Sequence, residues 1–170
     1  MARRLVSGCL ALAAFAALGR EASANGRPPA TSTITFRQGH ESDVAVGLTF
    51  GLLVSHDSGA TWEWVCENAI GYGGPYDPDY AFSASGALFA STFDGLKVMR
   101  DSCTFEITSS GTGFIATDLL GPDHTLYVAA SQQADPGHGV AGDFNIYRST
   151  DDGKTFPTKG QPPGVVSWWQ

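Results

Sequence analysis

Residues 55–62, SHDSGATW, place a cluster of polar, turn-forming residues between an apolar run and a tryptophan. A second copy, STDDGKTF, occupies residues 149–156, with serine, aspartate, glycine and threonine at the same offsets and an aromatic residue at the end. We call these stretches the first and second turn motifs. An enzyme rarely needs the same catalytic group twice, whereas a fold built from repeated units needs the same turn in each unit. The repetition therefore favours a structural role for both motifs.

The residue types of the turn motifs suit a tight connection between two antiparallel strands. The aspartate can accept hydrogen bonds from backbone N–H groups of the turn, and the glycine adopts a positive φ at little steric cost. The serine and threonine hydroxyls can fasten the flanks, and we expect the closing aromatic ring to turn into the apolar core. The residues in these roles are Ser55, Asp57, Gly59, Thr61 and Trp62 in the first motif, and Ser149, Asp151, Gly153, Thr155 and Phe156 in the second.

The rest of the chain has the pattern of an all-β protein. Short runs rich in Val, Ile, Phe, Tyr and Thr alternate with Gly, Asp, Pro and Ser, and no segment keeps a helical apolar period over three turns. The pattern predicts twelve strands in three groups of four. The expected strands are residues 33–36, 43–48, 52–55, 62–66, 80–84, 88–91, 96–99, 104–108, 114–119, 126–131, 144–149 and 155–158.

Aligning the three groups on their last strand reveals a repeat. Trp62, Phe105 and Phe156 then fall in register, and the middle copy of the motif, RDSCTF at residues 100–105, keeps its threonine and aromatic residue but has no glycine. The spacing suits a four-stranded propeller blade, which takes about 40 to 50 residues. The expected units are residues 33–68, 79–109 and 113–158, with 159–170 as a linker and the start of a further unit.

The motif S-x-D-x-G-x-T-W/F resembles the Asp-box, or bacterial neuraminidase repeat, of sialidases, sortilin-type receptors and many secreted bacterial propellers. The resemblance implies a β-propeller of four-stranded antiparallel blades, with the motifs on the outer rim and ligands bound at a central channel. It indicates a fold more than a function. Closed propellers have about 4 to 8 blades. Three units therefore predict an incomplete propeller. It is either a truncated product or fragment, or an open arc that completes itself through its exposed blade faces, by self-association or with another chain.

The first residues have the layout of a secretory signal peptide. Arg3 and Arg4 precede an apolar run at residues 10–18, and a small-residue cleavage pattern ends at Ala24. The run is shorter than the ~20 residues that a membrane span requires. We therefore expect a signal peptide at residues 1–24, a flexible tail at 25–32, no membrane span, and a secreted or periplasmic protein.

Charge and motif content exclude several classes of function. Three of the ten basic residues and one of the seventeen acidic residues lie in residues 1–24, so the remainder has a formal charge of −9. This balance, without a cluster of Lys and Arg, disfavours binding to nucleic acid. The sequence has no phosphate-binding loop, dinucleotide fingerprint, nucleophile elbow or zinc-ligand spacing. We expect no cofactor and no metal site.

The search for catalytic groups favours a binding protein over an enzyme. A sialidase needs three convergent arginines, and TFRQG around Arg37 begins like the sialidase Phe-Arg-Ile-Pro signature but lacks Ile-Pro. Other glycoside hydrolases need only two suitably spaced carboxylates. The sequence therefore predicts a secreted, non-enzymatic binding or scaffold module for a glycan or protein partner. A glycoside hydrolase catalytic segment and a purely structural assembly module remain the alternatives.

Five residues are candidates for ligand contacts. The stretch GYGGPYDPDY at residues 71–80 contains tyrosines that can stack on sugars or peptides, or can pack over the junction between two units. Asp118 lies on a strand that we expect to line the channel, and Asp43 is a further carboxylate candidate. The candidates are Asp43, Tyr72, Tyr76, Tyr80 and Asp118.

Cys66 and Cys103 are the only cysteines that follow the signal peptide. Each lies near the closing strand of its unit, so we expect both on the rim of adjacent units. An oxidising compartment permits a disulfide between them. Two free thiols are the alternative.

Overall fold

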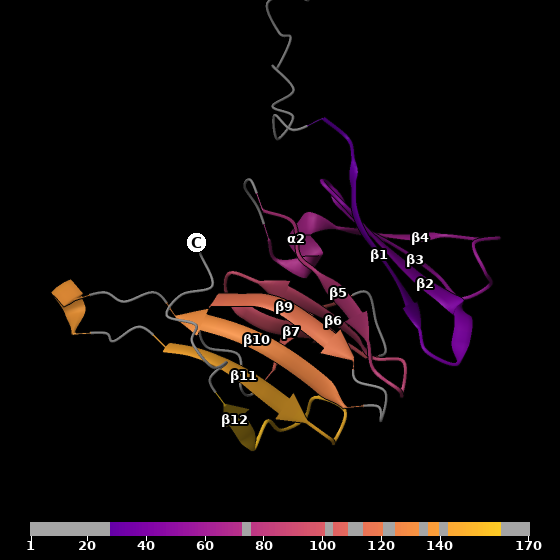
Figure 1. Ribbon diagram of the computed structural model, residues 1–170. Helices are drawn as coiled ribbons and strands as arrows, with labels where there is room; N and C mark the ends of the chain where they lie inside the picture. Colours follow the sequence, from indigo (N-terminus) through magenta and orange to yellow (C-terminus); the bar gives the residue numbers. More distant parts are fainter. Residues whose placement is uncertain are drawn as a thin grey trace, which may run out of the picture.

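The computed structural model describes residues 28–72, 76–100, 104–108, 114–120, 125–132, 136–139 and 143–160, which form three four-stranded antiparallel sheets (Figure 1). The first sheet contains β1 (Thr31–Arg37), β2 (His40–Leu48), β3 (Gly51–Ser55) and β4 (Glu63–Cys66). The second contains β5 (Tyr80–Phe82), β6 (Leu88–Thr92), β7 (Gly95–Met99) and β8 (Glu106–Ile107). The third contains β9 (Phe114–Leu120), β10 (Leu126–Gln132), β11 (Asp143–Ser149) and β12 (Thr158–Gly160).

Each sheet is a meander in which every strand pairs with its neighbours in the sequence. The expected β-rich architecture of four-stranded antiparallel units is therefore confirmed. Two short helical segments, α2 (Glu67–Ile70) and the 3₁₀ turn η1 (Pro136–His138), were not expected. The helix α2 ends because Gly71 adopts φ 77°, a left-handed conformation that glycine takes readily.

The last strand of the third sheet begins later than its sequence pattern predicts. The pattern predicts a strand at residues 155–158, but β12 starts at Thr158. Thr155 donates both its backbone N–H and its hydroxyl to the carboxylate of Asp151, so it belongs to the turn. Its N–H therefore bonds to a side chain and not to a neighbouring strand.

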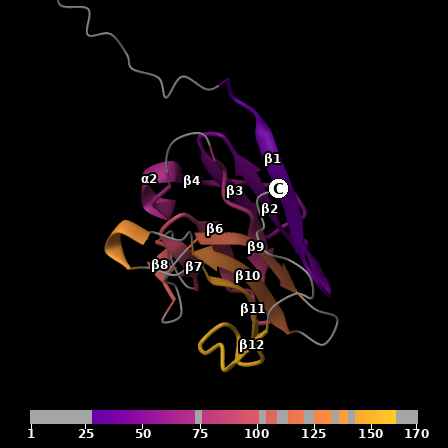
Figure 2. The same cartoon turned by 60° about the vertical axis from the view of Figure 1, so that its left-hand side comes forward.

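The three sheets pack face to face in sequence order (Figures 1 and 2). One apolar cluster joins the first sheet to the second, and another joins the second sheet to the third. The first includes Ala45, Leu52, Val54, Val65, Tyr80, Phe82, Leu88 and Phe105. The second includes Ala87, Phe89, Leu96, Val98, Leu126 and Val128, with Tyr147 and Phe156 packed against it. The second sheet is thus covered on both faces, and all five residues of β6 are buried.

The meander topology divides the molecule into two ends. One end, which we call the loop end, contains the turns between the second and third strands of the sheets. It also contains the connection from the first sheet to the second. The turns before the second strand and before the fourth strand, which include both turn motifs, lie at the opposite motif end. The first strand of each sheet contacts the first strand of the next, so β1, β5 and β9 lie side by side.

The closing aromatic residues of the motifs differ in burial. Phe105 is buried and Phe156 packs against the second apolar cluster. Trp62 is 43% exposed, so the expectation that its ring enters the core is wrong. Its indole lies over its own turn, where a Cβ on Gly59 would come within 3.2 Å of the ring.

We predict that Gly153→Ala destabilises the protein more than Gly39→Ala. Both glycines have a positive φ, 70° and 75°, which costs an L-residue about 1–2 kcal/mol. A Cβ on Gly153 would also collide with the ring of Phe89, whereas a Cβ on Gly39 meets nothing within 4 Å. Overpacking adds ~1–3 kcal/mol. Denaturant unfolding should give the larger loss for Gly153→Ala; equal losses would show that the second turn motif is not packed tightly on the second sheet.

Candidate functional site

The aspartate of each turn motif is surrounded by hydrogen-bond donors from its own turn. Asp57 Oδ1 accepts from the backbone N–H of Thr61 at 2.8 Å and from Ser55 Oγ at 2.9 Å. Asp57 Oδ2 accepts from Thr61 Oγ1 at 2.6 Å. The hydroxyl of Ser55 in turn accepts from the N–H of Gly59 at 2.9 Å, and Gly59 has φ 84°. The second motif repeats this arrangement.

These hydrogen bonds fix the charge state of both motif aspartates. Donation from the hydroxyl and backbone N–H of Thr61, and then from Ser55, lowers the pKa of Asp57 to about 2. The same set of donors, led by Thr155, holds the pKa of Asp151 far below its usual range. Each carboxylate is therefore ionised at neutral pH and already engaged by the donors of its own turn. Such a group suits a structural turn and not proton transfer.

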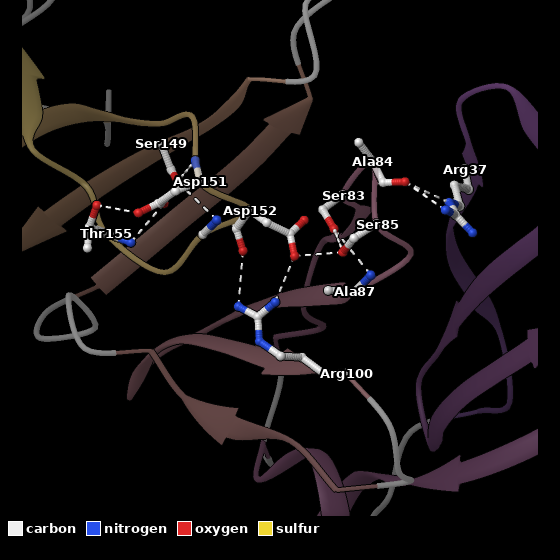
Figure 3. Close-up of polar contacts among 11 residues, drawn as sticks. Arg37, Ser83, Ala84, Ser85, Ala87, Arg100, Ser149, Asp151, Asp152 and Thr155 are labelled. Atoms are coloured by element: carbon white, nitrogen blue, oxygen red, sulfur yellow. Dashed lines mark hydrogen bonds and ion pairs between the residues drawn. The ribbon is translucent and has the colours of Figure 1, made fainter.

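Asp152, which follows the second motif's aspartate, joins the third sheet to the second (Figure 3). Its carboxylate accepts from Ser85 Oγ at 2.6 Å and from Arg100 Nη1 at 2.8 Å, and its carbonyl accepts from Arg100 Nη2 at 3.0 Å. Burial opposes its charge, but hydrogen bonds from Ser83, Ser85 and Arg100 outweigh burial and lower the pKa of Asp152. Sequence reasoning missed this bridge. The signal for it was that the second motif has a second aspartate, Asp152, directly after Asp151.

Asp43, a candidate ligand-binding residue, belongs to a second bridge at the motif end. Its carboxylate is paired with Arg37 Nη1 and His56 Nδ1, both at 3.0 Å. Arg37 also donates to the carbonyl of Ala84 in the second sheet at 3.2 Å and 2.7 Å. Burial opposes the charge of Asp43, yet its contacts with His56 and Arg37 lower its pKa. This geometry assigns Asp43 to the junction of two sheets.

The three candidate tyrosines have different environments at the loop end. Tyr80 is buried in the first apolar cluster. The hydroxyl of Tyr72 donates to the carbonyl of Leu48 at 2.8 Å, which ties the connection to the turn between β2 and β3. Tyr76 is 54% exposed and contacts Phe93 edge to face, with ring centroids 4.8 Å apart. We call Tyr76 and Phe93 the aromatic pair.

Asp118, the last candidate, lies on β9 opposite Val128 of β10. Its side chain is outside the part of the chain that the structure describes.

A short sequence repeat places aromatic residues at the loop end. Thr49-Phe50-Gly51-Leu52 and Thr92-Phe93-Asp94-Gly95-Leu96 both join the second strand of a sheet to the third. Their glycines have φ 136° and 130°, and both phenylalanines are exposed. Sequence reasoning missed Phe50 and Phe93, although the repeated Thr-Phe and Gly-Leu pairs were a visible signal.

Asp79 is a further loop-end residue that sequence reasoning missed. It immediately precedes β5, and its backbone is bonded to Ser91 in both directions: Ser91 N–H donates to the Asp79 carbonyl at 2.9 Å, and Asp79 N–H donates to Ser91 Oγ at 3.0 Å. Burial raises the pKa of the Asp79 carboxyl. A half-buried carboxyl of this kind can exchange hydrogen bonds with the hydroxyl groups of a ligand.

The expected disulfide is not present. Cys66 is a free, partly buried thiol at the end of β4. A disulfide requires two Cα atoms within about 7 Å, and α2 starts directly after Cys66 and packs against β3 and β4, which holds this cysteine within its own sheet. Cys103 lies outside the described residues.

Among the residues that the structure describes, no three His, Cys, Asp or Glu side chains gather as a metal site requires. The described part of the chain also contains no helix that is long and apolar enough to cross a membrane.

No family model matches the chain, and the search of curated proteins returned no match. Any function assigned to this chain therefore depends on the geometry of its described residues.

We predict that Asp57→Asn reduces the loss of stability in acid. Because the folded state lowers the pKa of Asp57 to about 2 from 3.8, its contribution is complete above pH ~4 and disappears as the pH falls through 2. The free energy of unfolding of the variant should fall less than that of wild type between pH 4 and pH 2. Denaturant unfolding at several pH values measures this, with Glu63→Gln as the control for losing an exposed negative charge. Parallel curves for wild type and Asp57→Asn would contradict the assignment.

We also predict that Asp79→Asn stabilises the protein at neutral pH. Burial disfavours the ionised carboxylate, so the folded state pays a cost at pH 7 that vanishes once the carboxyl is protonated in both the folded and unfolded states, below pH ~4. Thermal unfolding should show a higher melting temperature for the variant at pH 7 and no difference at pH 3. A lower melting temperature at pH 7 would mean that the carboxylate has a stabilising partner.

Proposed function

We propose that this chain is a non-enzymatic binding module of the Asp-box propeller class, which recognises a glycan or protein partner at its loop end. The observation that carries the proposal is the exposed aromatic pair. Tyr76 and Phe93 present ring surface to solvent and hold each other in an edge-to-face contact. Exposed aromatic rings are the side chains most often used as anchors in recognition.

The surroundings of the aromatic pair favour a preorganised surface. Phe93 lies in a tight turn closed by a hydrogen bond from Thr92 Oγ1 to the Gly95 carbonyl at 2.8 Å. The buried ammonium group of Lys97 donates to the carbonyls of Ile70 and Gly71, which anchors the connection that leads to Tyr76. A ligand that meets fixed rings loses less free energy to ordering of side chains.

The chemistry of the two ends supports a division of roles. At the motif end, the described carboxylates of Asp57, Asp151, Asp152 and Asp43 are engaged in turns or sheet bridges. At the loop end, Asp79 is half-buried and destabilised as a carboxylate, and aromatic rings are exposed. Exposed aromatic rings and a carboxyl whose pKa is raised by burial are typical of binding surfaces, which makes the loop end the better candidate for binding.

The class assignment is supported by the repeated turn motifs and by the stacking of four-stranded meanders with β1, β5 and β9 side by side. We propose that these sheets are propeller blades. The signal-like residues 1–24 support export of the protein to a secreted or periplasmic location. The excess of acidic residues supports a partner other than nucleic acid.

Glycoside hydrolysis is the second candidate function, and Asp79 favours it. A general acid in these enzymes needs a carboxyl whose pKa is raised, and burial acts on Asp79 in that direction. Asp77 lies two residues before Asp79, but the described residues do not show the two carboxyl groups on opposite sides of a substrate position. Hydrolysis of glycosides from a broad substrate panel, abolished by Asp79→Asn, would replace the binding proposal with this one.

We predict that Tyr76→Ala and Phe93→Ala each weaken binding of a glycan identified on a glycan array by about tenfold or more, the equivalent of ~1.4 kcal/mol. The matched control is Trp62→Ala, since Trp62 is exposed to the same degree as Phe93, 43% against 41%, but lies at the motif end. Titration calorimetry of the purified variants measures the affinities. Equal losses for all three variants, or no glycan bound by the wild type, would contradict a glycan site at the aromatic pair.

A further inference from the structure

The face of the first sheet that points away from the second sheet carries exposed apolar side chains. Directly paired residues of antiparallel strands lie on the same face, and the pairing register places Ile34, Val46, Leu53 and Trp64 in one row across β1, β2, β3 and β4. Ile34 is 62% exposed and Trp64 is 58% exposed. Phe36, two residues along β1, is also exposed. We call these five residues the outer face of the first sheet.

The opposite face of the same sheet shows what such a surface packs against. The residues that alternate with this row, Ala45, Leu52, Val54 and Val65, are buried against the second sheet. The second sheet packs in turn against the third. The chain therefore uses one mode of association twice, a four-stranded sheet laid face to face on another sheet. The outer face of the first sheet is therefore a surface on which another sheet could pack in the same way.

The face of the third sheet that points away from the second sheet is the surface that could pack on the outer face of the first sheet. Residues Leu126, Val128 and Tyr147 of the third sheet face the second sheet. The alternate residues Tyr127, Ala129, Ile146 and Arg148 lie on the other side, and Tyr127 pairs with Arg148 while Ala129 pairs with Ile146. The side chains described on this face include the apolar groups of Ala129 and Ile146 and the ring of Tyr127.

We propose that two copies of this chain form a closed dimer in which the outer face of each first sheet packs on the outer face of the partner's third sheet. The area favours two contacts over one. Four strands of about six residues cover roughly 20 Å by 20 Å, or about 400 Å², at ordinary strand spacing and rise. A stable interface buries about 800 Å² per partner, which two such contacts reach and one does not. The inference is independent of the proposed ligand site.

The proposal is tested by sedimentation velocity and light scattering on the full chain over a range of concentrations. Wild type is expected to be a dimer at micromolar concentration. Ile34→Glu places a charge in the first-sheet face, and Ile146→Glu places one in the third-sheet face, so each should raise the dimer dissociation constant at least about 100-fold. The matched control is Ile107→Glu. Ile107 is 57% exposed on β8, away from both faces, and its substitution should leave the dimer intact.

Each alternative outcome overturns the proposal. A wild-type monomer at all concentrations means that no second copy covers the face. Dissociation by Ile34→Glu but not by Ile146→Glu indicates a symmetric contact between two first sheets. Equal dissociation by Ile107→Glu indicates non-specific association. Circular dichroism verifies folding, and Trp64→Lys on the edge strand β4 replaces Ile34→Glu if that variant does not fold.

Discussion

The burial of both faces of the second sheet is the constraint on which the rest of the molecule depends. One face meets Leu52 and Val54 of the first sheet, and the other meets Leu126 and Val128 of the third. A four-stranded sheet cannot bury its own apolar side chains, so each unit needs a neighbour on at least one side. The middle unit therefore organises the other two, even though its turn motif is the most degenerate of the three.

Polar contacts at the motif end supplement this packing. Arg37 reaches from the first sheet to the carbonyl of Ala84, and Asp152 reaches from the third sheet to Ser85 and Arg100. Both bridges end on the turn between β5 and β6 or near it. Because they lie at strand ends and in turns, they fix the relative position of neighbouring sheets without interrupting the apolar layers between them.

The loop end has the opposite character. Its turns contain glycines with a positive φ, and the hydroxyl of Thr92 closes the turn at Phe93 by donating to the Gly95 carbonyl. Tyr76 and Phe93 contact each other and solvent, and Asp79 retains a carboxylate that burial disfavours. Proteins commonly accept such local costs where a surface has to recognise another molecule. The first sheet adds a second exposed apolar surface, which includes Ile34 and Trp64.

The sequence alone determined the β-rich class, the four-stranded units and the turn motifs, because these depend on local alternation and on short-range hydrogen bonds such as those of Asp57. Only the tertiary structure decided which tyrosine is exposed, why Trp62 is outside the core, and that Cys66 is a free thiol. It also gave Asp43 and Asp152 their roles as bridges between sheets. Burial and pairing depend on which faces of distant strands meet, and the spacing of residues along the chain does not contain that information.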